Sequence, residues 1–144
     1  MGTFEVFDHT ADVGLSLRGE GLADLLETAA RAVFAVMLDE GPTEAAIEAD
    51  LAAETGPEFR DDLGELLVVW LQELLARFET ERLVPLEFVS VEAGGGRARA
   101  RIRFGRFDPA RHVARAEIKA VTYHGLEVRA VPDGTWSARL VLDV

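Results

Sequence analysis

Acidic groups and an imidazole gather near one end of the sequence, and another carboxylate stands near the other end. The first group is the segment DHTAD, residues 8–12, which lies between two short stretches of alternating apolar residues. The second is Asp143, followed by Val144 with its terminal carboxylate. Hard divalent cations such as calcium and magnesium prefer oxygen ligands of this kind. Two interpretations stay open: a polar turn held by Asx hydrogen bonds, or part of a cation site that the fold completes.

A row of four arginines alternates strictly with apolar residues between positions 97 and 104. Such alternation predicts a strand with one basic face. The first interpretation is a solvated strand face that discourages edge-to-edge pairing. The second is a docking strip for an acidic patch or for RNA. The role of the row stays open; its members are Arg97, Arg99, Arg101 and Arg103.

Known catalytic motifs are missing from the sequence. The chain has no cysteine, which excludes disulfides, zinc thiolates and a cysteine nucleophile. Gly19-Glu20-Gly21 lacks the third glycine of the dinucleotide fingerprint, and the carboxylates of Glu20 and Asp24 would repel a pyrophosphate. The three histidines show no paired metal spacing, and no serine sits in a nucleophile elbow. We therefore expect no enzyme activity.

The charge of the chain is strongly negative, with 26 carboxylates against 15 Lys plus Arg and a net charge of −11. This field repels polyphosphate, so a basic protein partner or a cation fits better than bulk RNA binding. The start of the chain has no basic and apolar leader. Its longest apolar stretch, residues 66–71, is too short to span a bilayer. We expect a cytoplasmic protein without membrane association.

Two helices are predicted near residues 21–38 and 61–81. The second carries an unbroken apolar stripe from Leu63 to Phe78, and Asp62 with Glu65 forms a capping box at its start. Strands are predicted at residues 3–7, 13–17, 86–91, 98–104, 113–123, 125–131 and 136–144, with a weaker one near 45–51. Helices grouped early and strands late predict a single α+β domain over residues 1–144. Both helices are expected to pack on one face of a mainly antiparallel sheet.

Three stretches together resemble the archease family. FDHTADVG at residues 7–14 is similar to the opening signature of archeases, and EIKAVTYHGLEV at residues 117–128 is similar to their longer second signature. Trp136 followed by a strand that closes in Leu142-Asp143-Val144 is similar to their C-terminus, where Asp-Ile is the usual close. The order and spacing agree over essentially the whole chain.

The resemblance implies a non-catalytic partner of the guanylate-using RNA ligase of tRNA splicing and RNA repair. The ligase holds the manganese and the catalytic histidine, and the archease promotes guanylation and repeated turnover. Carried over by position, Asp12 and Asp143 are metal-binding carboxylates, and Val144 completes the site through main-chain or terminal oxygen. Calcium is the first expectation for the metal, with magnesium or manganese as alternatives. Lys119 corresponds to a lysine implicated in activity, and RNA is contacted only through the ligase.

Two other classes of function stay open at this point. One is a more general RNA- or protein-binding chaperone. The other is a metal-dependent hydrolase that uses Asp12, His9 and Asp143, which would need an open water position on the metal.

Overall fold

The computed structural model describes residues 1–9 and 12–144 of the chain. Its elements, in chain order, are β1 (Thr3–His9), β2 (Asp12–Gly19), α1 (Leu22–Met37), β3 (Leu38–Glu40), β4 (Ile47–Glu54), a 3-10 turn (Pro57–Phe59), α2 (Leu63–Glu81), β5 (Leu83–Gly94), β6 (Arg97–Arg106), β7 (Val113–Ala114), β8 (Ala120–Ala130) and β9 (Trp136–Asp143). Every strand pair in the described part is antiparallel. The predicted α+β class is therefore confirmed.

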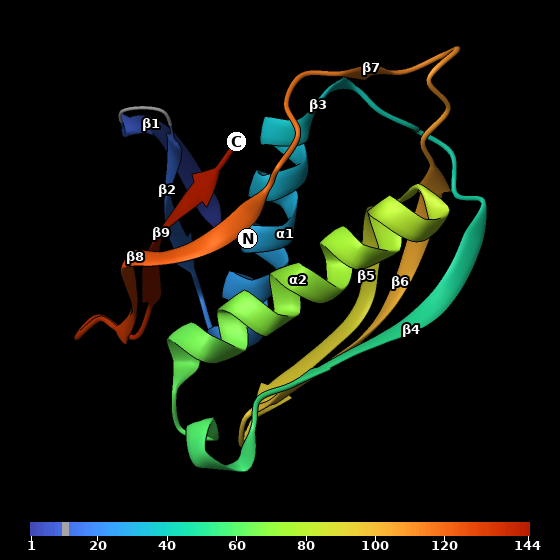
Figure 1. Cartoon of the computed structure of the whole chain (residues 1–144). Coiled ribbons are helices and arrows are strands. Elements are labelled where there is room, and N and C mark those ends of the chain that lie inside the picture. The colour runs from blue at the N-terminus through green and yellow to red at the C-terminus, as the bar shows by residue number, and fades with distance from the viewer. Residues whose placement is uncertain (10–11) are drawn as a thin grey trace.

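The strands divide into three sheets rather than one. A four-stranded sheet has the order β1-β2-β9-β8, a three-stranded sheet has the order β4-β6-β5, and β3 pairs with β7. Each helix contacts both larger sheets: α1 packs on β2 and β5, and α2 packs on β4 and β8 (Figure 1). The helices therefore join two sheets instead of covering one face of a single sheet.

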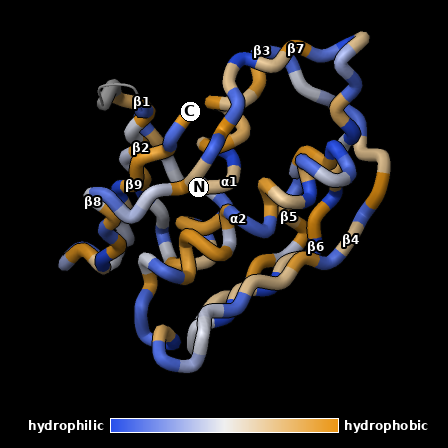
Figure 2. The backbone as a smooth tube through the Cα atoms, in the orientation of Figure 1, coloured by the Kyte–Doolittle hydropathy of each residue, from blue (hydrophilic) through white to orange (hydrophobic). Residues whose placement is uncertain are grey.

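The helices form where the apolar stripes predict them, because each stripe lies on one side of its helix. The side chain of Asp62 accepts a hydrogen bond of 3.0 Å from the Glu65 N–H, as the capping box requires. Helix α2 ends at Arg82 in the left-handed conformation, with φ of 58°. Apolar and polar segments follow one another within each element in Figure 2, as expected for elements with one buried side.

One hydrogen bond inside the core joins the two helices. Trp70 on α2 is fully buried, and its indole N–H donates to the main-chain oxygen of Leu26 on α1 at 2.9 Å. A buried donor without a partner is costly, so this bond fixes the position at which α2 crosses α1. About two turns further along the same helices, Phe34 on α1 and Phe78 on α2 pack edge to face, with ring centroids 5.9 Å apart.

The strand predicted over residues 113–123 is interrupted in the structure. Only 113–114 form β7, and β8 begins at residue 120. The N–H groups of Arg115 and Ala116 donate to the main-chain oxygen of Met37 at 2.7 and 3.2 Å, so this segment closes over the end of α1 instead of continuing as a strand. The last part of that predicted strand, residues 120–123, joins the strand predicted at 125–131 to form one strand, β8, with an irregular middle.

We predict that Leu67→Ala or Leu71→Ala in α2 lowers the free energy of unfolding by about 2–5 kcal/mol, because each leaves a cavity in a closed core. Leu67 is 1% exposed and Leu71 0%. Urea denaturation followed by circular dichroism measures the change. Gln72→Ala on the exposed side of the same helix is the control, with an expected change within about 0.5 kcal/mol. An equal loss in the control would contradict the burial of this stripe.

Candidate metal centre and partner surface

Two acidic residues from distant parts of the sequence face each other in the four-stranded sheet. The register of β2 and β9 pairs Asp12 with Asp143. Residues directly opposite in an antiparallel pair share one face of the sheet, with Cβ atoms about 4.5–5.5 Å apart. Both residues are half-buried, as is Val144, which follows Asp143. The fold thus brings together the three residues predicted to bind metal.

The beginning of β8 completes this end of the sheet. Ala120 lies opposite Asp143 on its other side, and the main-chain N–H of Lys119 donates to the main-chain oxygen of Asp143 at 2.7 Å. The backbone of His9 lies opposite Asp12 in β1. One row across the four strands therefore reads His9, Asp12, Asp143 and Ala120, with the exposed Lys119 beside it. We call this row together with Lys119 and Val144 the acidic end.

The donors at the acidic end fit a hard divalent cation. Like charges directly opposite each other in a sheet destabilise it, and a cation between them removes that repulsion. Carboxylate and main-chain oxygens, with water completing the shell, are what calcium accepts. Among the described side chains, which leave out those of residues 8–11, no group of three or more His, Cys, Asp or Glu is arranged to hold a metal. The described residues offer a site here two carboxylates and the oxygens of Val144, and the metal itself stays a prediction.

Part of the predicted polar turn lies outside the described residues. Thr10 and Ala11 are not described, and neither are the side chains of Asp8 and His9. The hydrolase alternative, which needs the His9 side chain, therefore stays untested.

In the first signature, residues 7–14, close packing requires a glycine at position 14. The ring of Phe7 lies directly over Gly14, where an added Cβ would meet Phe7 Cε2 at 2.1 Å. Arg139 on β9 stacks on the same ring, with its guanidinium carbon 4.7 Å from the ring centroid. Glycine at position 14 therefore allows an aromatic ring to lie across the sheet next to the acidic end.

The second signature forms a bulge in β8 that sequence reasoning missed. Thr122 pairs with Val141 and Glu127 with Arg139, so residues 123–126 of β8 lie opposite a single residue of β9. Gly125 in this bulge has a φ of 68°, which favours glycine. The bulge reaches the start of α2, where the hydroxyl of Tyr123 donates to Glu65 Oε1 at 2.7 Å. This hydrogen bond raises the pKa of Tyr123. The glycine beside an aromatic residue was the available signal in the sequence.

The arginine row lies on β6, and three of its four arginines pair with carboxylates. Arg101 and Arg103 both bond Glu48 on β4, at 2.7 and 3.0 Å from their Nε atoms. Arg101 also pairs with Asp50, Arg103 with Glu87, and Arg97 with Glu54. Three of the four cations are therefore engaged with carboxylates on adjacent strands, which favours the solvated strand face over a docking strip for RNA.

The ion pairs of Glu48 make the stability of the fold depend on pH. Hydrogen bonds from Arg103 and Arg101 lower the pKa of Glu48 below its ordinary value of 4.5. A carboxyl with a lowered pKa in the folded state stabilises the fold above its unfolded pKa, and this contribution disappears as pH falls through the folded value.

We predict that Glu48→Gln loses less stability than the unchanged protein between about pH 6 and about pH 3, because the variant lacks the carboxylate that is protonated in this range. Urea midpoints at the two pH values measure the difference. Glu44→Gln, at an exposed position in the loop before β4, serves as control and should follow the unchanged protein. Identical pH dependence in Glu48→Gln would contradict the role of these ion pairs.

For the acidic end, we predict that calcium raises the melting temperature and that a chelator lowers it again, since an ion that binds only the folded state stabilises it. Asp12→Asn or Asp143→Asn should abolish the response, because each removes one of the two carboxylates that would bind the ion. Thermal scans with calcium and with chelator measure both effects. Glu44→Gln should keep the full response. A chelator effect that survives in Asp12→Asn would remove Asp12 from the site.

No helix among the described residues is long and apolar enough to cross a membrane.

Comparison with known proteins shows that the whole chain matches one family. A family model described as "Archease protein family (MTH1598/TM1083)" matches residues 4–144. The archease of Pyrococcus furiosus is 35% identical over 147 residues, covering 100% of both chains. The solution structure of protein 1598 of Methanobacterium thermoautotrophicum is 34% identical, covers 98% of each chain and superposes with a TM-score of 0.72. A crystal structure from Thermotoga maritima, described as an archease and possible chaperone, shares the fold at 18% identity and a TM-score of 0.54, covering 97% of this chain and 96% of that one.

These matches define a class of small α+β proteins that share this fold. The chain belongs to the archease family, as the resemblance of its sequence predicted.

Proposed function

We propose that this protein is a non-catalytic activator of an RNA-splicing ligase in tRNA processing and RNA repair, promoting its guanylation and multiple turnover. The observation that carries the proposal is the convergence of β2, β8 and β9, which gathers Asp12, Asp143 and Lys119 at one end of a sheet. These are the residues to which the family resemblance assigns metal binding and activity.

An accessory protein accelerates a partner in two ways: by binding its reactive conformation more tightly, or by delivering an ion that it needs. The acidic end is suited to both. Two opposed carboxylates can bind a divalent ion and carry it to the partner. The overall charge of −11 attracts a basic surface on the partner. The resident metal would be held by Asp12, Asp143 and Val144, where it would fix the β2–β9 end in one conformation.

Lys119 differs from every other cation of the chain. It is the only lysine, the other 14 basic side chains being arginines. Its backbone is fixed by the bond to Asp143, and its side chain is exposed. Lysine carries a compact point charge on a flexible stem. We infer that Lys119 contacts an acidic group of the ligase beside the metal.

A general protein-binding chaperone is the second candidate, and one feature favours it. A groove of about 530 Å³ opens between the end of α1, the end of α2 and residues 107–118. Its apolar lining includes Met37, Leu75, Phe78, Phe107 and Ile118. Leu75 is half-buried and the other four side chains are at most 8% exposed, so a protein segment in the groove would meet the edge of the core. A chaperone acting through the groove would depend on these residues and not on the acidic end.

The deciding assay mixes sub-stoichiometric protein with its cognate ligase, guanosine triphosphate, manganese and RNA with ligatable ends, and counts ligations per ligase. We predict many turnovers with the unchanged protein and the level of ligase alone with the Asp12→Ala, Asp143→Ala double variant. Folding of the variant is checked by circular dichroism. Leu75→Ser, which alters the groove, should retain the stimulation, whereas a general chaperone would lose it. Full stimulation by the folded double variant would defeat the proposal.

The single lysine allows a direct test of contact. A short amine-to-carboxyl cross-linker applied to the complex with the ligase can join a ligase carboxylate to this chain only through the amine of Lys119 or the N-terminal amine. We predict a cross-linked peptide that contains Lys119, together with reduced stimulation by Lys119→Ala. Lys119→Arg keeps the charge, so it should retain part of the stimulation while losing the cross-link. Cross-links through the N-terminal amine alone would place the contact elsewhere.

A further inference from the structure

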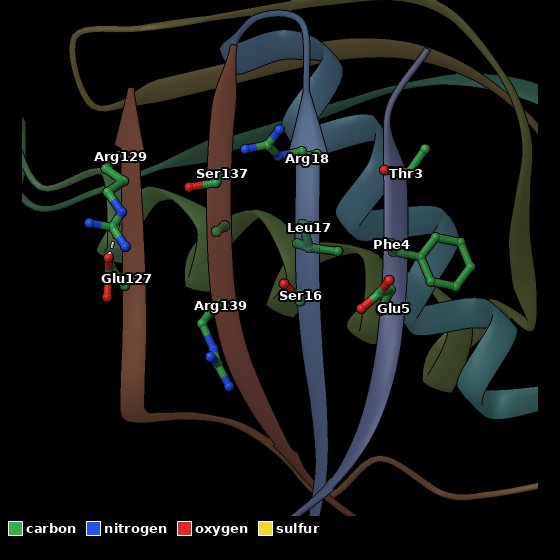
Figure 3. A pocket seen from close by; sticks show the side chains of 11 residues that line it. Thr3, Phe4, Glu5, Ser16, Leu17, Arg18, Glu127, Arg129, Ser137 and Arg139 are labelled. Atoms are coloured by element: carbon green, nitrogen blue, oxygen red, sulfur yellow. Dashed lines mark ion pairs between the residues drawn. The ribbon is translucent and has the colours of Figure 1, made fainter. Parts of the chain in front are cut away.

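The outer face of the β1-β2-β9-β8 sheet carries a second polar surface, away from the acidic end. Leu15, Leu17 and Leu140 point into the core from the two central strands, so their neighbours along each strand point outward. Figure 3 shows this face with the helices behind the sheet. Four of its outward residues form one row in register across the sheet: Thr3, Arg18, Ser137 and Arg129.

This row alternates hydroxyls with guanidinium groups and contains no carboxylate; we call it the hydroxyl–guanidinium row. The next row along the strands reads Glu5, Ser16, Arg139 and Glu127. Its two carboxylates lie on the edge strands β1 and β8, whereas the central strands present serine and arginine. The central strands of the face thus present arginine and serine without a carboxylate, while Arg129 lies on the edge strand β8 beside Glu127.

Arg18 and Arg129 on this face have fewer carboxylate partners than Arg101 and Arg103 on β6. No carboxylate of the described residues lies within 4.0 Å of Arg18 as an ion pair. Arg18 also interacts electrostatically with Asp133, whose Oδ1 already accepts hydrogen bonds from the Thr135 N–H and hydroxyl, at 2.9 and 2.6 Å. Arg129 pairs with the exposed Glu127 at 2.7 Å. Such an exposed pair is weak, so its guanidinium can exchange that partner for another anion.

A shallow hollow lies over these side chains, with a volume of about 350 Å³. The labelled side chains of Arg18, Ser137 and Arg129 come from three adjacent strands along its upper part in Figure 3. The hollow exceeds the space that one tetrahedral anion needs, and it is open to solvent, so a phosphate attached to a larger molecule can enter it.

We propose that the hydroxyl–guanidinium row is a binding site for a phosphate group, held between Arg18 and Arg129 with the hydroxyl of Ser137 as donor. Guanidinium groups match phosphate oxygens through paired N–H donors, and hydroxyls add a single donor each. This site is separate from the acidic end and does not depend on the proposed role with a ligase.

The acidity of the chain does not cancel the site. Asp143 and Ser137 are six residues apart on β9, which corresponds to about 20 Å along a strand. Charges in solvent are screened beyond about 8 Å at physiological ionic strength. The acidic end is therefore largely screened from the row, and attraction acts only on groups that reach the face itself.

The test follows amide and arginine Nε signals of ¹⁵N-labelled protein by NMR while sodium phosphate replaces sodium chloride at constant ionic strength. We expect saturable shifts that centre on residues 16–18, 129 and 136–139. Arg18→Gln should weaken the apparent affinity roughly tenfold or more, as expected for loss of a hydrogen bond from a charged donor. Arg97→Gln, an exposed arginine on β6, is the matched control and should leave the affinity unchanged.

A second titration with a ten-residue oligouridylate distinguishes the sources of the phosphate. Shifts with both probes support a site for any phosphate group, and shifts with the oligonucleotide alone support one for a polynucleotide strand. Linear shifts without saturation for both probes overturn the proposal. Equal weakening by Arg18→Gln and Arg97→Gln overturns it as well, since that result would reflect net charge alone. Spectra of both variants without ligand confirm that each remains folded.

Discussion

The antiparallel pairing of β2 with β9 is the constraint on which the rest of the structure depends. On its inner side, the pairing aligns Leu15 with Leu140 and buries both completely. On its outer side, the same register sets Asp12 against Asp143 and Arg18 against Ser137. A shift of one residue would exchange the two faces, because side chains alternate along a strand. The core and both polar surfaces therefore share one register.

The helices hold the two larger sheets together, and their position limits how far the acidic end can adjust. The Trp70 indole bonded to Leu26 fixes α2 on α1 inside a closed core. The bulge of β8 then fastens the four-stranded sheet to the start of α2 through Tyr123 and Glu65. Binding at the acidic end thus acts on a strand, β8, that is already connected to the helix linking the two sheets.

Local patterns predicted the helices well because an apolar stripe is a property of neighbouring residues. The start of α2 followed from Asp62 and Glu65, whose hydrogen bond is local. The break before β8 could not be predicted in this way, since its cause is the bonding of Arg115 and Ala116 to the distant Met37. The division into separate sheets is equally non-local. The carboxylates of the candidate site could be identified in the sequence. Their proximity, Asp12 beside Asp143, could be inferred only from the fold or from a family resemblance.

The distance in sequence between β2 and β9 has a consequence for synthesis of the chain. The β5–β6 hairpin pairs across a short turn, and β4 can join it as soon as β6 has emerged. Strand β2 can form a hairpin with β1 early, but its other edge waits for residues near the end of the sequence. Closing so long a loop is slow. During translation the nascent chain therefore carries an unpaired strand edge, which exposes it to aggregation until β9 has been made.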